Sequence, residues 1–198
     1  MVAVRNGDIV TVTTADGQPG VQTVVGTPAI EWWPALSPDG RWLTYASNES
    51  GRYEIYVRQY PGPGLAEQVS MDTPVTPASP STPRGQVTGA FSPAWHPNGT
   101  GLFFLTTQDL ASARFSMMAA TFEPGSPPRI GQPRQLFHFD GRELVIACAP
   151  MRCYDVASDG EQFYGVKPLL AMPAAPVVTH VSIVQNWFEE LKAKVPSQ

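Results

Sequence analysis

The sequence is poor in charge and has no long apolar run. Charged residues make up 15% of the 198 residues, and the formal net charge is −4. Ordinary globular domains have roughly 25% charged residues. Because no cluster of lysine and arginine is present, we expect no nucleic-acid partner. No stretch approaches the roughly 18 apolar residues that cross a bilayer, so we expect no membrane span in this chain.

Cysteine is also scarce, with Cys148 and Cys153 separated by four residues. This spacing does not match the Cys-x-x-Cys arrangement of zinc knuckles, so we expect no metal site here. Two interpretations stay open. The pair forms a small disulfide loop in an oxidising compartment, or the two residues are half-buried, unpaired side chains. We favour the second.

Motifs for catalysis are missing as well. The sequence contains no Gly-x-Ser-x-Gly elbow, no glycine-rich phosphate loop and no kinase catalytic loop. His96, His138 and His180 lie in different parts of the chain without neighbouring partners. We therefore expect no catalytic residue, no metal ligand and no cofactor, and we do not expect an enzyme.

What the chain does contain is an internal repeat, together with 21 prolines and 17 glycines. Three stretches share one pattern: residues 33–43, 92–102 and 153–163. In each, a short apolar run leads to Pro-Asp-Gly, Pro-Asn-Gly or Ser-Asp-Gly, and a second apolar run follows. Proline presets φ for a turn and glycine accepts a positive φ. Each stretch therefore predicts a β-hairpin closed by a turn with a glycine bulge.

The turn residues recur in every repeat: Asp39, Gly40, Asn98, Gly99, Asp159 and Gly160. Two interpretations of the Asp and Asn side chains are open. They form a ring of oxygen ligands on one face, or they accept hydrogen bonds from nearby backbone N–H groups and stabilise the turns. We favour the turn, because a turn requirement repeats with every unit.

Further strands are expected around the hairpins, and a helix near the end of the chain. Residues 186–196 begin with Asn186, carry acidic residues early and lysines late, and stop at Pro196, which favours a helix. We predict one all-β domain over residues 1–198, a partial β-propeller of about three four-stranded antiparallel blades with a short C-terminal helix. Its parts are outer strands of an incomplete blade (1–30), two blades (31–70 and 86–138), an incomplete blade (139–185) and the helix (186–196).

Three residues are candidates for an interaction surface. One of the adjacent Trp32 and Trp33 must point away from the face that the other occupies, and Trp32 is our candidate for that place. Arg52 and Tyr53 fall in an expected hairpin loop, and both residue types are common anchors at protein interfaces. A solvated loop without a partner is the plainer alternative.

The repeats resemble the TolB-type, WD40-like propeller repeat over most of the chain. The runs 32–51 and 186–192 look like the end of the propeller that follows the kinase domain in bacterial receptor-like serine/threonine kinases. Such propellers have six or more blades, whereas this chain has about three hairpin units and no kinase domain. The resemblance implies an extracytoplasmic location if the chain is attached to such a kinase. The region Met1 to Val12 lacks the features of a signal peptide, so expression as this chain alone implies the cytoplasm.

Together these observations predict a non-catalytic interaction or sensor module that forms the C-terminal part of a larger propeller. The alternative is a gating or substrate-filtering domain of a kinase or serine peptidase whose catalytic domain is absent here. A truncated reading frame without a function of its own is a third hypothesis. We expect a protein or peptide partner. We also expect self-association, in which two copies close one ring as a homodimer, because free blade edges and faces favour association.

Overall fold

The computed structural model describes residues 1–15, 18–62, 64–71, 89–107, 113–144 and 152–166. These residues belong to the first of two compact units, Met1–Pro168 and Leu169–Gln198. The described part consists of strands, turns and loops. The helix predicted over 186–196 and the last strand of the incomplete blade lie outside the described residues.

The described residues form fourteen strands in four antiparallel sheets. The first sheet contains β1 (Val2–Arg5), β2 (Asp8–Ala15) and β3 (Gln18–Val25). The second contains β4 (Glu31–Leu36), β5 (Trp42–Ser47), β6 (Glu54–Gln59) and β7 (Glu67–Gln68). The third contains β8 (Gly89–Trp95), β9 (Gly101–Thr107), β10 (Arg114–Glu123), β11 (Arg129–Ile130) and β12 (Arg134–Asp140). The fourth is the hairpin of β13 (Tyr154–Val156) and β14 (Phe163–Gly165).

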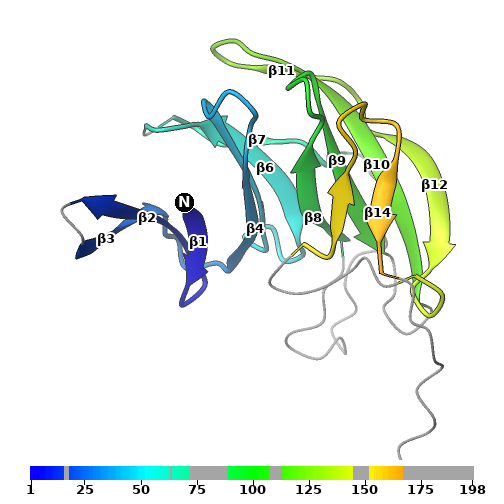
Figure 1. The fold of residues 1–198 in the computed structure, drawn as a ribbon, viewed down its shortest axis with the longest axis horizontal. Coiled ribbons are helices and arrows are strands. Elements are labelled where there is room, and N and C mark those ends of the chain that lie inside the picture. The colour runs from blue at the N-terminus through cyan, green and yellow to red at the C-terminus, as the bar shows by residue number, and fades with distance from the viewer. Residues whose placement is uncertain (16–17, 63, 72–88, 108–112, 145–151, 167–198) are drawn as a thin grey trace, which may run out of the picture. The chain divides into compact units, whose positions relative to one another are not determined.

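The sheets are meanders, in which each strand pairs with the one before it in the chain. The orders β4-β5-β6-β7 and β8-β9-β10 follow the sequence, and β11 and β12 both pair with β10. Strands β1 and β4 are in contact, and so are β4 and β8. Figure 1 shows the first three sheets side by side in chain order. The predicted fold class, an all-β partial propeller of antiparallel blades, is confirmed.

The three repeat turns have one geometry. Gly40, Gly99 and Gly160 have φ of +69°, +78° and +75°, as the turn pattern predicts. In each turn the glycine N–H donates to the carbonyl three residues earlier, at 2.8 Å. The preceding Asp or Asn accepts a hydrogen bond from the second backbone N–H that follows it, at 3.1 Å for Asp39, 2.9 Å for Asn98 and 2.9 Å for Asp159. The side chains therefore complete their own turns.

The first sheet differs from the expectation. We predicted two outer strands, but the sheet has a third strand, β1, joined to β2 by Asn6 and Gly7 at positive φ. Asn-Gly is a strong hairpin signal, and the prediction of two strands overlooked it. The segment 123–133, which contains four prolines, also holds a short strand, β11.

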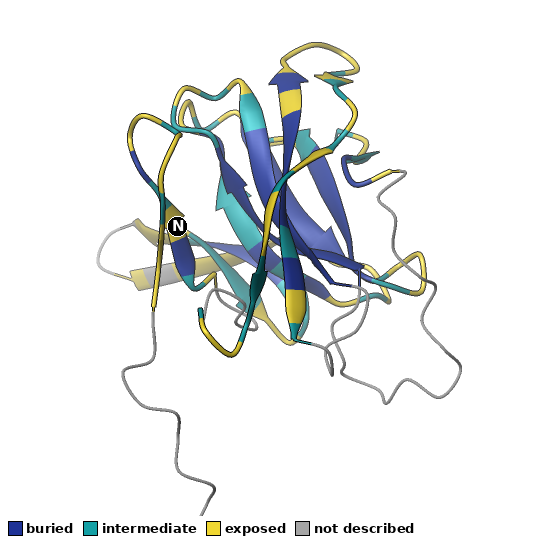
Figure 2. Ribbon diagram, turned by 90° about the vertical axis from the view of Figure 1, so that its right-hand side faces the viewer, coloured by how far each residue is buried: buried dark blue, intermediate teal, exposed yellow. Residues whose placement is uncertain are grey.

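The main core lies between the second and third sheets and reaches the last hairpin. It includes Trp33, Trp42, Ile55, Phe91, Trp95, Phe104, Leu105, Met117, Phe122 and Tyr154. A smaller cluster contains Ile9, Val25, Leu43, Tyr45 and Tyr56 and joins the first sheet to the second. Figure 2 shows the buried residues concentrated in the strands. Every residue of β5 and β8 is buried, which explains why their sequences are continuous apolar or small runs.

Replacing Gly40 with valine should lower the free energy of unfolding by about 1–3 kcal/mol, because a β-branched residue is strained at positive φ. No atom lies within 4 Å of a Cβ added at Gly40, so the loss would come from the backbone alone. Urea unfolding of Gly40→Val measures it. Gly40→Asn is the matched control and should lose less, because asparagine tolerates this region. Wild-type stability in Gly40→Val would contradict the turn assignment.

Candidate functional site

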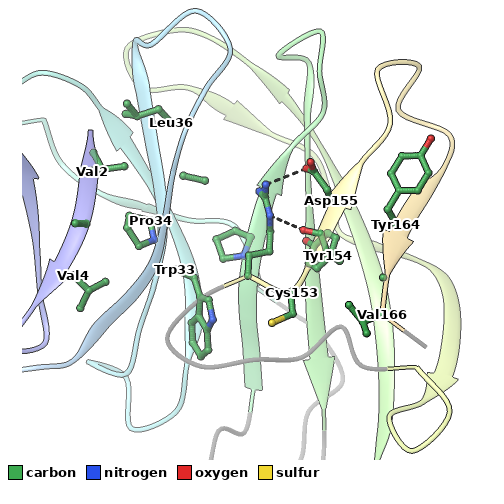
Figure 3. A pocket seen from close by; sticks show the side chains of 15 residues that line it. Val2, Val4, Trp33, Pro34, Leu36, Cys153, Tyr154, Asp155, Tyr164 and Val166 are labelled. Carbon is green, nitrogen blue, oxygen red and sulfur yellow. Dashed lines mark hydrogen bonds and ion pairs between the residues drawn. The ribbon is translucent and has the colours of Figure 1, made fainter. Parts of the chain in front are cut away.

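The described residues surround an open groove at the inner strands of the sheets. Its volume is about 970 Å³, and β1, β4, β8 and the β13–β14 hairpin contribute to its walls (Figure 3). The lining residues are Val2, Ala3, Val4, Trp33, Pro34, Ala35, Leu36, Pro93, Arg152, Cys153, Tyr154, Asp155, Tyr164, Gly165 and Val166. The groove thus collects residues from both ends of the described sequence. Our sequence analysis did not predict it.

The groove has one fixed charged pair. Arg152 Nε donates to the carbonyl of Tyr154 at 2.9 Å, and Arg152 Nη2 contacts Asp155 Oδ1 at 3.2 Å. The guanidinium also lies 5.6 Å from the centre of the Tyr154 ring. The Arg152 side chain is 32% exposed, so it presents a positive group whose position is set by three contacts. Asp155 presents a carboxylate beside it, so the groove offers both signs of charge at one place.

Apolar side chains surround this pair. Val166 is 61% exposed and Tyr164 is 59% exposed, although both are large hydrophobic residues. On the opposite wall Val2, Val4 and Leu36 are half-buried. Figure 3 shows the valines of β1 across the groove from Val166 and Tyr164. Exposed apolar groups beside a few positioned polar groups are typical of binding sites.

Two equivalent prolines shape the floor of the groove. Pro34 in β4 and Pro93 in β8 occupy the same repeat position, and each follows a residue at positive φ, Trp33 at +52° and Ser92 at +55°. The strand register shifts at both places, between Trp32 and Ala35 and between Phe91 and Ala94. Proline cannot donate to a ladder, so it fits a strand where a bulge interrupts pairing.

Each bulged strand accepts a hydrogen bond from an aromatic side chain of the next sheet. Trp95 Nε1 of β8 donates to the carbonyl of Ala35 at 3.1 Å. The hydroxyl of Tyr154 in β13 donates to the carbonyl of Ser92 at 2.8 Å. Tyr154 is buried, and this burial raises the pKa of its hydroxyl. These bonds hold consecutive inner strands side by side and so define the groove.

Cys153 lies in the groove wall and is disulfide-bonded. Cys148, the other cysteine of the sequence, lies outside the described residues. The interpretation that we favoured, two unpaired side chains, is therefore wrong for Cys153. A pair of cysteines with four residues between them is compatible with both alternatives, so the sequence alone does not decide whether a disulfide forms.

Of the three candidate interaction residues, the structure places Tyr53 in the core and leaves Trp32 and Arg52 partly exposed. Tyr53 is only 6% exposed, and its ring stacks on Trp32 with centroids 5.7 Å apart. Burial raises the pKa of Tyr53 to about 12. Arg52 pairs through Nε with the buried carboxylate of Glu54, which also accepts a hydrogen bond from Ser70. Tyr53 is thus a core residue, while Trp32 is half-buried and packs against the core. The sequence of the loop does not indicate that Tyr53 is buried, because its aromatic partners are distant in the chain.

The histidines that the structure describes lie apart from one another. His96 is half-buried, accepts a hydrogen bond at Nδ1 from the Asn98 N–H at 3.3 Å, and lies so close to Gly160 that an added Cβ would overlap its ring. His138 lies on the exposed strand β12. His180 is outside the described residues. Among the residues described, no three His, Cys, Asp or Glu side chains gather into a group that could hold a metal ion.

One buried carboxylate is incompletely satisfied. Glu31 is fully buried, one of its oxygens accepts a hydrogen bond from the Thr27 hydroxyl, and its Oε2 has no partner. Burial is the main reason that the pKa of Glu31 is raised above its ordinary value, and the nearby charge of Asp8 adds to the effect. The charged form of Glu31 is therefore costly to the fold.

Comparisons with known proteins identify no family for this chain. No family model matches the chain, and no curated protein matches it. Among solved structures, the chain is similar to one from Agrobacterium tumefaciens named putative TolB, with 10% sequence identity and a TM-score of 0.31. The similarity covers 68% of this chain, and it spans 62% of the length of that protein. No helix in the described ranges is long and apolar enough to cross a membrane.

Replacing Glu31 with glutamine should stabilise the protein at about pH 8 and change its stability little at about pH 4. Because the folded-state pKa of Glu31 is raised, the stabilising contribution of the protonated group is present at low pH and is lost as the pH rises through that pKa. Urea unfolding of Glu31→Gln at both pH values measures the difference. Glu143→Gln, at an exposed carboxyl, is the control. A larger gain at low pH would contradict the assignment.

Proposed function

We propose that this chain is a non-catalytic interaction module, the C-terminal part of a larger propeller, which binds a segment of a partner protein in the groove. One observation supports the proposal above the others. The groove combines exposed apolar side chains with an Arg152–Asp155 pair held in place by hydrogen bonds. A polypeptide segment suits this chemistry, because it presents apolar side chains together with backbone donors and acceptors.

The openness of the groove, more than its volume, favours a peptide over a small ligand. About 970 Å³ is at the upper end of the roughly 300–1,000 Å³ of small-molecule pockets. The groove is also open, with Val166 and Tyr164 more than half exposed. A partner that extends beyond the groove would cover these two side chains, and exclusion of water from apolar contacts is the main favourable term in association.

The link to a kinase rests on the sequence resemblance. We propose that the module senses a ligand or partner for a receptor-like kinase. The alternative is gating or substrate filtering for a kinase or serine peptidase, for which the same groove would receive the segment to be filtered. Sequencing the reading frame upstream of Met1 tests the two: a kinase domain with a membrane span would support sensing, and a hydrolase domain would support substrate filtering.

We also propose that the chain self-associates. The first sheet has three strands and the last described sheet has two, whereas the second has four and the third five. Among the described residues the two end sheets therefore have fewer strands than the sheets between them, and sheets with unpaired strand edges and apolar faces favour association. In the closed-ring form of the hypothesis, the first sheet of each copy lies beside the last hairpin of the other.

Replacing Val166 with aspartate should weaken peptide binding by roughly tenfold or more, because it places a charge on an exposed apolar contact of the groove. A peptide selected from a random display library on the wild-type protein serves as the probe, and isothermal titration gives its Kd for each variant. Val166 is 61% exposed, so the variant should retain the wild-type melting temperature.

Leu65→Asp is the matched control. Leu65 is 86% exposed and does not line the groove, so this variant should bind the peptide like the wild type. Equal Kd values for wild type and Val166→Asp would contradict the groove as the binding site. A library that yields no peptide sensitive to Val166→Asp would contradict the proposal of a peptide-binding module.

A further inference from the structure

The first sheet ends at its third strand, β3, whereas the second and third sheets have further strands. After the third strand of the second sheet comes β7, and after the third strand of the third sheet come β11 and β12. After β3, the chain reaches β4 through residues 26–30. Five residues cannot form a strand beside β3 and also return to β4. In the part of the chain that the structure describes, no fourth strand pairs with β3. Figure 1 shows β3 at the end of the sheet away from β4.

Hydrogen bonds within the sheet identify which groups of β3 face outward. Val12 N–H donates to the Met1 carbonyl at 2.8 Å, and the Met1 amino group donates to the Val12 carbonyl at 3.1 Å. Both backbone groups of Val12 thus point toward β1. Val21, the register partner of Val12 on β3, consequently forms no ladder bond with it. The N–H and C=O of Val21 therefore point to the outer edge. Because backbone groups alternate in direction along a strand, the N–H and C=O of Thr23 and the C=O of Pro19 also point to the outer edge.

This edge is less protected against pairing than the outer strands β7 and β12. β3 is eight residues long and has no charged residue, and Val21 is 47% exposed. By contrast, β7 has only two residues, and β12 carries Arg134 and Asp140. Edge strands are normally shortened or charged in order to prevent association. Proline at position 19 costs the edge one donor but leaves the donors of Val21 and Thr23.

We propose that β3 pairs with β3 of a second copy of this chain, antiparallel across a two-fold axis at Val21. This inference rests on the self-association proposed above and names its contact. Val21 N–H of each copy donates to the Val21 carbonyl of the other. Thr23 N–H of each copy donates to the Pro19 carbonyl of the other. The two first sheets become one continuous sheet.

The edge is complementary to itself in three ways. The register around Val21 places each Pro19 carbonyl opposite a Thr23 N–H, so each Pro19–Thr23 pair keeps one of its two ladder bonds although proline has no N–H. The strand is uncharged, so no like charges meet across the axis. A two-fold arrangement uses the same patch on both copies, which is the commonest symmetry of homodimers.

Replacing Val21 with proline tests the contact. It removes the central outward N–H, and proline is tolerated at an edge position whose N–H does not face the sheet, so the chain should still fold. Sedimentation equilibrium should show a wild-type dimer, and the dissociation constant of Val21→Pro should rise at least tenfold. Thr23→Lys, which adds a charge to the same edge, should weaken the dimer in the same direction. Leu65→Lys, at an exposed loop residue, is the control and should dimerise like the wild type.

The outcomes separate the two hypotheses. A wild-type dimer that Val21→Pro and Thr23→Lys leave unchanged would overturn the β3 contact and leave self-association standing, with the closed ring as its form. A wild-type protein that is monomeric throughout the micromolar range would overturn both. If the wild type is monomeric and an extended peptide from another protein pairs with the β3 edge, that edge binds a partner segment. The proposed dimer is then wrong.

Discussion

The arrangement of the sheets depends on one constraint, the proline in each of the inner strands β4 and β8. Pro34 and Pro93 cannot donate to the ladder, so the strands bulge at the residue before them and the register shifts. Aromatic donors from the next sheet then bind carbonyls of the bulged strands, Trp95 to Ala35 and Tyr154 to Ser92. A buried carbonyl without a partner is costly, so each bulge specifies which side chain must lie beside it.

The groove follows from the same constraint. The inner strands β4 and β8 are held side by side, and their prolines form its floor between β1 and the β13–β14 hairpin. Arg152 and Cys153 immediately precede Tyr154, so the residues that complete the wall are positioned by the tyrosine that binds β8. The charged pair and the disulfide-bonded cysteine of the groove are therefore consequences of how the last hairpin attaches to the third sheet.

The sequence predicts local structure well where one residue type decides it. Glycine at positive φ and the Asp or Asn side chains are predictable, because a turn is a contact between near neighbours. Burial of Tyr53 was not predictable, since its partners Trp32 and Trp33 come from another strand. The groove was missed for the same reason. The groove brings together β1 and β14, which lie near opposite ends of the described chain, and no spacing in the sequence indicates that they are close in space.

Removal of the Tyr154 hydroxyl tests the central claim most directly. In Tyr154→Phe the Ser92 carbonyl loses its donor in a buried place, and the account predicts a loss of about 1–3 kcal/mol in the free energy of unfolding measured with urea. Tyr164→Phe makes the same chemical change at a side chain that is 59% exposed and should leave stability unchanged. Equal stability of Tyr154→Phe and Tyr164→Phe would contradict the claim that aromatic donors at the bulges hold the sheets together.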